Sequence, residues 1–392
     1  MKGQPDISLA IPASPSVSTS YKMDYDIDKR RRRRNLCTLF CDPCRYIRFC
    51  LRSLTYNYFN SKGMVMDTCM EPVFWLVNHV TKYMGPMMVI LVIILSSTIV
   101  SVVYICILPR CIEEEDYVEL IFHLIFGHWL LMNIAFHYYK GVTTPPGYPP
   151  QILSDKSVAT ICKKCIAPKP PRTHHCSICN KCILRMDHHC PWINNCVGHY
   201  NYRYFILFCI YMWSGTLYIC ISAWPLFKEE FFDPRKTFDS LLSGSLFFTL
   251  LHSYKVSAKQ NMTDPLLNRV SSLSSSESAY HKAVVFQFIV CFSVLIALGV
   301  LTAWHVRLIC RGETSIEKYT NDSERARLKK VNVVYRNPYN FGVKENWRKL
   351  LGLYGGRTFW QHALLPSSHP PEHDGTQWES QITPGYVPTA LA

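Results

Sequence analysis

Cysteine and histidine are concentrated in one short stretch of this sequence. The 38 residues from Cys162 to His199 hold seven cysteines and five histidines. Tetrahedral zinc sites take four ligands each, so two sites would use eight of these twelve residues, and at least one cysteine could then be free to react. Three pairs have the Cys-x2-Cys spacing by which one tight turn grips a metal ion: Cys162 and Cys165, Cys176 and Cys179, and Cys179 and Cys182.

The spacing leaves two interpretations of this cluster open. Zinc clusters are more often scaffolds than catalysts, so every cysteine and histidine could be structural. The alternative is a reactive thiol beside structural metal, for which the run Asp187-His188-His189-Cys190 is the candidate. Spacing alone does not say which eight residues bind the metal ions.

Apolar segments on both sides of the cluster must hold it in place. Crossing the hydrocarbon of a bilayer takes about 20 residues, and the apolar residues here are clumped rather than periodic. Four segments are long enough: Met84 to Leu108, Val118 to Tyr139, Tyr204 to Phe227 and Ala283 to Ile309. The sequence therefore predicts an α-helical polytopic membrane protein with four transmembrane helices and a zinc-binding cysteine-rich domain between helices 2 and 3.

The second segment is the least apolar of the four. It contains His123, His128, Asn133 and His137, and polar side chains are costly within a bilayer. A buried helix of a soluble core is the alternative for this segment.

Basic residues indicate which side of the membrane the cluster faces. The loop from Lys140 to Arg203 has nine Lys or Arg against two Asp, and a basic run from Lys29 to Arg34 precedes the first span. The loop after that span is acidic from Glu113 to Asp116. Because Lys and Arg favour the cytosolic face, we expect both termini and the cluster in the cytosol. Cysteines there serve as metal ligands or reactive thiols rather than disulfides.

The net charge of +14 limits the classes of partner. It suits the anionic headgroups of a lipid bilayer or a polyphosphorylated substrate. A protein with four membrane spans cannot use its basic run as soluble nuclear proteins do, so no nucleic acid partner is expected.

Changes in composition divide the chain into eight segments. We expect a disordered basic N-terminal segment (1–34), an interfacial amphipathic segment (35–83), transmembrane helices 1 and 2 (84–139), a cytosolic cysteine-rich zinc domain (140–203), transmembrane helix 3 (204–227), a lumenal loop (228–282), transmembrane helix 4 (283–309) and a cytosolic C-terminal region (310–392). The lumenal loop carries a glycosylation sequon at Asn261, and the tail from Ser367 onward is expected to be unstructured. The interfacial segment has cysteines that could accept acyl chains or serve as apolar fillers: Cys37, Cys41, Cys44 and Cys50.

Several motifs resemble those of one known family. They are Cys162-x2-Cys165, Lys169-Pro170-Pro171-Arg172, His175-Cys176-x2-Cys179-x2-Cys182, Asp187-His188-His189-Cys190-Pro191-Trp192, Asn195-Cys196-Val197-Gly198 and Asn201-x3-Phe205. Together they resemble the cysteine-rich domain of the DHHC protein S-acyltransferases. Thr314-Ser315-Ile316-Glu317 and Asn337-Pro338-Tyr339-Asn340 resemble the two motifs that follow the last span in that family.

The resemblance implies a role for each residue of the cluster. One structural Zn²⁺ is expected on Cys162, Cys165, His175 and Cys182, and a second on Cys176, Cys179, His189 and Cys196. Cys190 is then unligated and becomes the nucleophile, with His188 as its general base and Asp187 orienting that imidazole. Thr314, Ser315 and Asn340 are expected to support the site.

The implied reaction is palmitoyl transfer in two steps. Cys190 takes the acyl group from palmitoyl-CoA and passes it to a cysteine of a membrane-associated protein substrate. Lys169, Arg172 and Arg185 could grip the phosphates of acyl-CoA, although they could equally be solvated surface charges. A membrane-anchored zinc scaffold and a RING-like ubiquitin ligase are the alternatives, but neither needs an unligated cysteine beside Asp187 and His188. The resemblance implies the endoplasmic reticulum membrane, or else the Golgi.

Two departures from the family pattern concern the site. The usual Asp-Pro-Gly after the second span is Pro145-Pro146-Gly147, which removes a carboxylate and leaves a rigid turn. The usual Thr-Thr-x-Glu has serine at Ser315, which keeps the hydroxyl that would hydrogen-bond the catalytic residues.

Overall fold

The structure is a computed structural model that describes residues 62–150, 160–233 and 275–381, with the side chains of residues 62–69, 71, 72 and 275 left aside. The chain divides into two compact units, Met1–Leu76 and Val77–Ala392, and the second holds the features below except the beginning of the first helix. The N-terminal disordered segment, most of the interfacial segment with its four cysteines, and the sequon at Asn261 lie outside the described residues.

Four helical stretches in the described part are long and apolar enough to cross a membrane, as predicted. They are Val73–Glu113, Tyr117–Thr143, Tyr202–Ser222 and Ser276–Cys310. The first comprises α3 (Lys62–Val102), the π-helix η2 (Val103–Ile107) and α4 (Leu108–Glu113). The second comprises α5 (Tyr117–Phe122), the π-helix η3 (His123–Gly127) and α6 (His128–Thr143). The third is α7 (Tyr202–Ser222), and the fourth is α11 (Ser275–Cys310).

The weakest predicted span does form a continuous helical stretch. Asp116 begins it, because its side chain accepts a hydrogen bond from the Glu119 N–H at 2.9 Å and caps the helix. Two of its polar residues, Asn133 and His137, are buried inside the protein. Burial against neighbouring helices keeps these polar groups away from lipid, which explains how so polar a segment can span.

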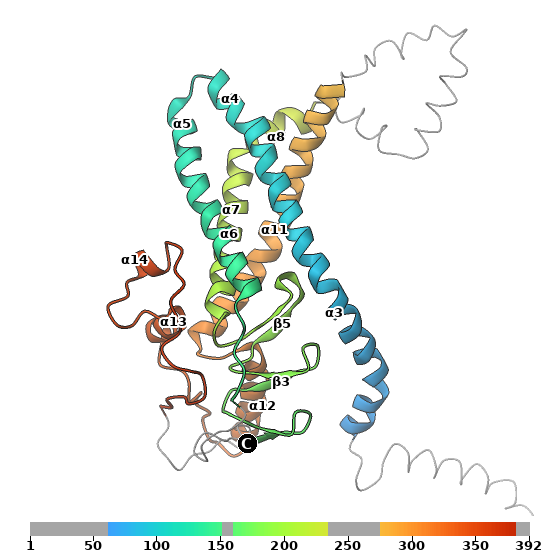
Figure 1. The fold of residues 1–392 in the computed structure, drawn as a ribbon, viewed down its shortest axis with the longest axis vertical. Helices are drawn as coiled ribbons and strands as arrows, with labels where there is room; N and C mark the ends of the chain where they lie inside the picture. The colour runs from blue at the N-terminus through green and yellow to red at the C-terminus, as the bar shows by residue number, and fades with distance from the viewer. Residues whose placement is uncertain (1–61, 151–159, 234–274, 382–392) are drawn as a thin grey trace, which may run out of the picture. The chain divides into compact units, whose positions relative to one another are not determined.

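The third span ends earlier than predicted. The sequence suggested helix to Phe227, but α7 ends at Ser222 and a short helix α8 (Trp224–Phe231) follows, with Pro225 in its first turn. Proline fits the first turn of a helix but cannot continue one, so the chain breaks there. Helix α7 packs against both α6 and α11 (Figure 1). Their contacts form the main core, which lies next to the cysteine cluster.

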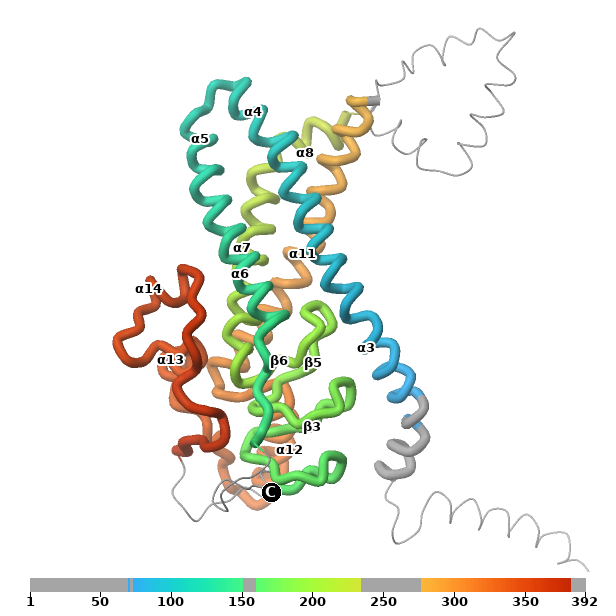
Figure 2. The backbone as a smooth tube through the Cα atoms, viewed as in Figure 1, coloured from blue at the N-terminus to red at the C-terminus, as the bar shows by residue number. Residues whose placement is uncertain are grey.

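In its described part, residues 160–203, the cysteine-rich domain forms three small antiparallel hairpins. The hairpins are β1 (Thr160–Cys162) with β2 (Ala167–Lys169), β3 (His174–Cys176) with β4 (Lys181–Ile183), and β5 (His188–Cys190) with β6 (Asn195–Val197). The tube in Figure 2 shows them following one another after α6. Strands of three residues do not form a stable hairpin alone in water. Metal ligation and packing on the helices must supply their stability.

The third hairpin is fixed to the membrane helices on both sides. The Asn195 amide donates to the carbonyls of Gly141 and Thr144 at the end of α6, at 3.1 and 2.9 Å. The Asn201 side chain accepts from Gly198 N–H and donates to the Cys196 carbonyl, both at 2.8 Å, just before α7 begins. The hairpin that carries Cys190 therefore lies where α6 ends and α7 begins.

Between α11 and residue 381 the chain forms three short helices, α12 (Ser315–Lys329), α13 (Val343–Leu351) and α14 (Phe359–His362). Asn346 donates to the carbonyl of Cys310, the last residue of α11, at 3.1 Å, and Asn337 donates to the carbonyl of the next residue, Arg311, at 2.8 Å. Asn340 in turn accepts from Asn346 at 2.8 Å.

The prediction of an unstructured tail from Ser367 is wrong up to residue 381. Residues 363–381, here called the C-terminal strap, have no regular secondary structure but are held by side chains of the spans and the zinc domain. Tyr211 donates to the Ala363 carbonyl at 2.7 Å, Arg203 to the His369 carbonyl at 2.5 Å, and the His199 ring bonds the His373 carbonyl at 2.7 Å. These contacts join residues more than 150 positions apart, so no local pattern predicts them.

Candidate active site

The eight predicted ligands come together as two groups of four. Cys162, Cys165, His175 and Cys182 form the first group, and Cys176, Cys179, His189 and Cys196 the second. Within each group one ligand atom per residue lies within 4.8 Å of the others. Each group can hold a metal ion, which agrees with the predicted pairing.

The distances within the groups fit a tetrahedral ion. Zn–S bonds of about 2.3 Å require neighbouring sulfurs about 3.8 Å apart. The Sγ atoms of Cys182 and Cys165 are 3.7 Å apart, and those of Cys179 and Cys196 are 3.5 Å apart. The Nδ1 atoms of the two histidines face their cysteines, at 3.2 Å from Cys165 Sγ for His175 and 3.3 Å from Cys179 Sγ for His189.

The two groups repeat the same pattern along the chain. Each ligand of the second group lies 14 residues after its counterpart in the first. The backbone repeats as well, because Ile166, Asn180 and Asn194 have left-handed φ angles of 52°, 53° and 47° in the three hairpin turns. The three hairpins are therefore copies of one unit.

Cys190 belongs to the third copy, which lacks its own metal site. It ends β5 as Cys176 ends β3, and both follow the sequence His-His. The position that Cys179 takes in the second copy is Ile193 in the third, so the Cys-x2-Cys pair is broken. Cys190 consequently stands in a ligand position without partner ligands, and it lies in neither group.

Asp187 and His188 form a tightly bonded pair at the start of the same hairpin. His188 Nδ1 lies 2.6 Å from Asp187 Oδ2, and the carboxylate is 1% exposed. Ser315 donates to this carboxylate twice, from its N–H at 2.8 Å and from its hydroxyl at 2.9 Å. The motif after the fourth span therefore contacts the site directly. Because Nδ1 is occupied by Asp187, Nε2 is the His188 atom left for Cys190.

The pKa values of this pair move in opposite directions. Burial lowers the pKa of His188, but its interactions with Asp187 and the Cys190 thiol outweigh burial and raise it to about 9. Burial raises the pKa of Asp187, but the contacts with His188, His305 and Ser315 outweigh burial, and the net pKa is lowered. At neutral pH the pair is therefore an imidazolium beside a carboxylate.

The surroundings of Cys190 are apolar. Cys190 is buried in an apolar cluster with side chains from α6, α7, α11 and the turn of its own hairpin: Tyr138, Ile193, Phe205, Phe208, Cys209 and Ile309. A charged pair beside an apolar core suits a reagent with one polar and one long apolar part.

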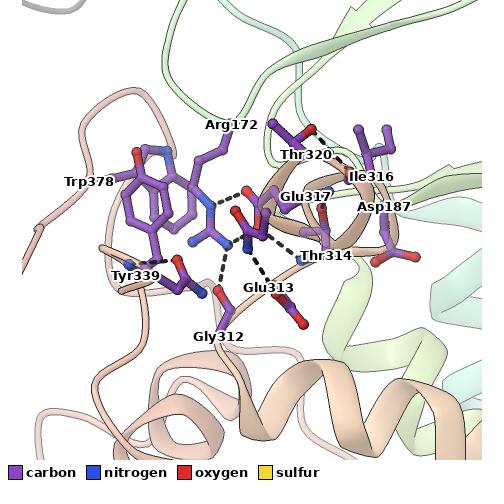
Figure 3. Close-up of polar contacts among 12 residues, drawn as sticks. Arg172, Asp187, Gly312, Glu313, Thr314, Ile316, Glu317, Thr320, Tyr339 and Trp378 are labelled. Carbon is purple, nitrogen blue, oxygen red and sulfur yellow. Dashed lines mark hydrogen bonds and ion pairs between the residues drawn. The ribbon is translucent and has the colours of Figure 1, made fainter. Parts of the chain in front are cut away.

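Arg172 joins the zinc domain to α12. Its Nε and Nη2 donate to the two carboxylate oxygens of Glu317 at 2.6 and 2.7 Å, and both side chains are buried. Figure 3 shows the guanidinium between Glu317 and the rings of Tyr339 and Trp378, which lie 4.4 and 4.6 Å from it. Burial raises the pKa of Glu317, but Arg172 outweighs it and the net pKa is lowered. Glu317 also accepts the Thr314 N–H at 2.8 Å in the capping box that begins α12.

The other two basic residues predicted to bind phosphate are less engaged. Lys169 ends β2 and is half-buried. Arg185 lines a cavity of about 440 Å³ together with Lys349 and Trp378, and its Nε is buried with no hydrogen-bond partner in the described part of the chain. Burial and the charge of Arg172 lower the pKa of Arg185 to about 10, so it remains cationic.

The turn at Pro145-Pro146-Gly147 packs directly on the zinc domain. Pro146 and Gly147 accept backbone hydrogen bonds from Tyr200 and Leu184 at 3.1 and 3.0 Å. Gly147 has φ +102°, and a Cβ there would lie 2.6 Å from the Tyr200 ring, so only glycine fits.

Sequence reasoning missed His305 and Tyr202. His305 of α11 and Tyr202 of α7 are buried next to Asp187 and hydrogen-bond each other at 3.1 Å. A histidine within a span that is otherwise almost purely apolar was the available signal, since ionisable residues inside a membrane are commonly functional.

Comparison with known proteins gives consistent matches. Residues 156–322 match the family model described as DHHC palmitoyltransferase. The chain is 44% identical over 335 residues to Palmitoyltransferase ZDHHC16 of Homo sapiens, covering 86% of each chain. It is 40% identical over 347 residues to Palmitoyltransferase ZDHHC16A of Danio rerio, covering 85% of this chain and 88% of that one. It is 30% identical over 296 residues to Probable protein S-acyltransferase 13 of Arabidopsis thaliana, covering 69% and 82%.

Proposed function

The chain belongs to the DHHC palmitoyltransferase family, and we propose that Cys190 is the residue through which it transfers palmitate to protein cysteines. Protein S-acyl transfer is the activity of this family, so the chain is a palmitoyltransferase. One observation carries the proposal for Cys190. It stands outside both four-residue ligand groups, next to the bonded pair of Asp187 and His188.

The reaction is an exchange of thioesters in two steps. The Cys190 thiolate attacks the carbonyl of palmitoyl-CoA, the bond to the coenzyme sulfur breaks, and the coenzyme thiolate leaves with a proton from His188. The thiol of a substrate cysteine then gives its proton to His188 and attacks the carbonyl of acyl-Cys190, the bond to the Cys190 sulfur breaks, and the Cys190 thiolate and protonated His188 are restored. Reactant and product thioesters have similar energies, so catalysis depends on positioning and on the supply of thiolate.

His188 and Asp187 divide the proton chemistry between them. His188 takes the proton of Cys190 through Nε2 and returns it to the leaving sulfur. Asp187 holds the ring by Nδ1 and stabilises its positive charge. Thr314 and Ser315 support this pair, Ser315 through its two hydrogen bonds to Asp187 and Thr314 through the cap that positions Ser315. Asn340 supports it indirectly, by holding Asn346 at the end of α11.

The two ligand groups bind structural Zn²⁺. Thiolate and imidazole donors in fours are the ligands of structural zinc, which would supply the folding free energy that three-residue strands lack. Because the third hairpin shares Cys196 and His189 with the second metal site, zinc there also fixes the strand that carries Cys190.

Palmitoyl-CoA binds with its two parts in different surroundings. The acyl chain lies among the apolar side chains around Cys190. Lys169 and Arg185 contact the coenzyme phosphates, supported by the unpartnered Nε of Arg185. Arg172 contributes its charge, although two of its donors are held by Glu317.

The predicted topology follows from the same chemistry, because acyl-CoA is cytosolic. The zinc domain (140–203) and both termini lie in the cytosol, segment 228–282 is lumenal, and the membrane is that of the endoplasmic reticulum or the Golgi. Basic residues around the zinc domain support this orientation. In protein made on microsomes, Asn261 is expected to be glycosylated and Asn321 is not. An epitope near Asp155 that is shielded from protease in sealed vesicles would refute the topology.

A labelling experiment tests the function. Purified protein is incubated with radiolabelled palmitoyl-CoA, separated by denaturing gel electrophoresis and treated with neutral hydroxylamine, which cleaves thioesters. We expect one hydroxylamine-sensitive label per chain, which chases onto a cysteine peptide anchored in vesicles. A protein that binds zinc and takes up no label would favour a zinc scaffold or a RING-like ligase instead.

A further inference from the structure

His305 is a buried polar residue of the fourth span that lies next to Asp187. It belongs to α11 near the end of the fourth span and is 2% exposed. Its Nδ1 lies 3.1 Å from the hydroxyl of Tyr202 and 4.0 Å from Oδ2 of Asp187. Nothing in the reaction described above uses it.

The ring of His305 also packs against the catalytic imidazole. The ring centroids of His305 and His188 are 5.5 Å apart, and Phe205 lies about equally close to both, at 5.0 and 5.1 Å. His188 therefore has a wall of two rings, one from α7 and one from α11. Moving either ring would leave His188 free to tilt.

The Asp187 carboxylate has partners on more than one helix. Ser315 of α12 donates to it twice. On the membrane side the Tyr202 hydroxyl interacts with the same carboxylate and with His305. A buried carboxylate needs its oxygens satisfied, since an unpartnered one costs several kcal/mol. Three elements distant in sequence therefore meet at Asp187.

We propose that His305 is a positioning residue for acyl transfer, which with Tyr202 fixes the Asp187–His188 pair so that Nε2 of His188 faces Cys190. This inference rests on the proposed role of Cys190. It assigns to the fourth span a direct part in aligning the site, in addition to membrane anchoring.

Two replacements separate positioning from simple packing. His305→Phe keeps a ring and its apolar contacts but removes the nitrogen that faces Tyr202 and Asp187. His305→Asn keeps a polar group close to the place of Nδ1 and loses most of the ring. If the nitrogen matters, the smaller Asn variant is the more active of the two, whereas a packing role predicts the reverse order.

The experiment measures autoacylation of purified full-length protein with palmitoyl-CoA. For His305→Phe we expect kcat to fall about 10- to 100-fold, because misplacement of a catalytic group by about 1 Å has effects of that size. KM for palmitoyl-CoA should stay within about twofold, since His305 does not contact the donor. His305→Asn should recover part of the loss. Tyr202→Phe, which removes one hydroxyl and keeps the shape, should lower kcat in the same way.

His281→Phe is the matched control. His281 is a buried histidine on the same helix, 3.3 Å from Glu230 and remote from Cys190, so its loss should leave kcat unchanged. Zinc content is measured for every variant. The rate of Cys190 alkylation by iodoacetamide is also measured, because it reports the alignment of Asp187 and His188 in the absence of acyl-CoA.

The outcomes distinguish this inference from the proposed function. Absence of label on Cys190 in the unchanged protein would defeat the proposed function itself. Normal kcat in both His305→Phe and Tyr202→Phe, or a His305→Phe variant more active than His305→Asn, would overturn the positioning role alone. Because Asp187, His188 and His305 are close enough to share an ion, a third zinc per chain that His305→Asn removes would overturn it as well.

Discussion

Cys190 ends the first strand of its hairpin at the position where Cys176 ends the first strand of the preceding one. Both follow two histidines, and their hairpins pair in the same register, with the central histidine opposite a cysteine in each. Cys176 has a Cys-x2-Cys partner in Cys179, whereas Cys190 has Ile193. The proposed nucleophile is thus a metal-ligand position whose own metal site is missing, and the hairpin holds it in place for chemistry.

Replacing Cys190 should separate chemistry from metal binding. Cys190→Ser is expected to abolish hydroxylamine-sensitive labelling by palmitoyl-CoA, because a neutral hydroxyl cannot replace the thiolate. It should retain two zinc ions per chain, measured by inductively coupled plasma mass spectrometry, since Cys190 lies in neither ligand group. Zinc loss in this variant would refute the division of the cysteines.

Replacing Cys176 should have the opposite effect. Cys176→Ser removes one of four ligands of the second group, so that site should lose most of its affinity and its hairpin should unfold. We expect zinc to fall from two ions per chain toward one and labelling to disappear with it, because His189 and Cys196 lie in the hairpin of Cys190. A fully active variant with one zinc would contradict the structural role of that metal.

Replacing His188 should lower the rate of autoacylation, and raising the pH should restore part of that rate. His188→Ala is expected to slow autoacylation about 100-fold or more at neutral pH, because the thiol of Cys190 then lacks its base. An unassisted thiol has a pKa near 8.5, so the rate should rise as the pH is increased from 7 to 9 and the defect should narrow. A defect of constant size across this range would indicate a structural role.

Much of the site could be predicted because its information is local. The Cys-x2-Cys spacing identified metal ligands, and motif resemblance divided them into the two groups that the structure brings together. The apolar runs predicted four spans, with the end of the third misjudged because Pro225 starts a new helix. Thr314 and Ser315 were expected to support the site, and Ser315 donates a hydrogen bond to Asp187.

What could not be predicted depends on pairs distant in sequence. The ion pair of Arg172 with Glu317 joins residues 145 positions apart. The sequence therefore predicted Arg172 as a phosphate contact or a solvated charge, and not as a buried ion pair. The C-terminal strap has the composition of an unstructured tail, and only the side chains it meets, such as Arg203 and Tyr211, give it a fixed path. His305 was overlooked because the fourth span was identified only by its length and its run of apolar residues. A single histidine in such a span is itself informative.

The basic residues should divide into a substrate contact and a structural contact. Lys169→Ala is expected to raise KM for palmitoyl-CoA several-fold with little change in melting temperature, because Lys169 is half-buried at the end of β2. Arg172→Ala should instead destabilise the protein by about 3 to 5 kcal/mol, the usual cost of leaving one partner of a buried ion pair alone. We measure melting curves and KM values for both variants to tell a substrate contact from a structural one. Lys181→Ala, at an exposed position of β4, is the control. If Arg172→Ala is stable and has a raised KM for palmitoyl-CoA, then Arg172 binds the coenzyme phosphates rather than stabilising the fold.

The pairing of Glu317 should also be visible as a pH dependence of stability. The folded protein holds the pKa of Glu317 below its ordinary value, because Arg172 outweighs the effect of burial. A carboxylate with a lowered pKa stabilises the fold at pH above its unfolded value of about 4.3, and this contribution is lost as the pH falls through the lower folded value. The melting temperature of the unchanged protein should therefore exceed that of Glu317→Gln by a constant amount between pH 8 and pH 5, and the gap should narrow only below about pH 4.3. Both proteins have the same zinc ligands, so acid weakens metal binding equally in each and the difference isolates Glu317. A gap that already closes between pH 7 and pH 5 would mean that burial dominates and that the carboxyl is protonated in the fold.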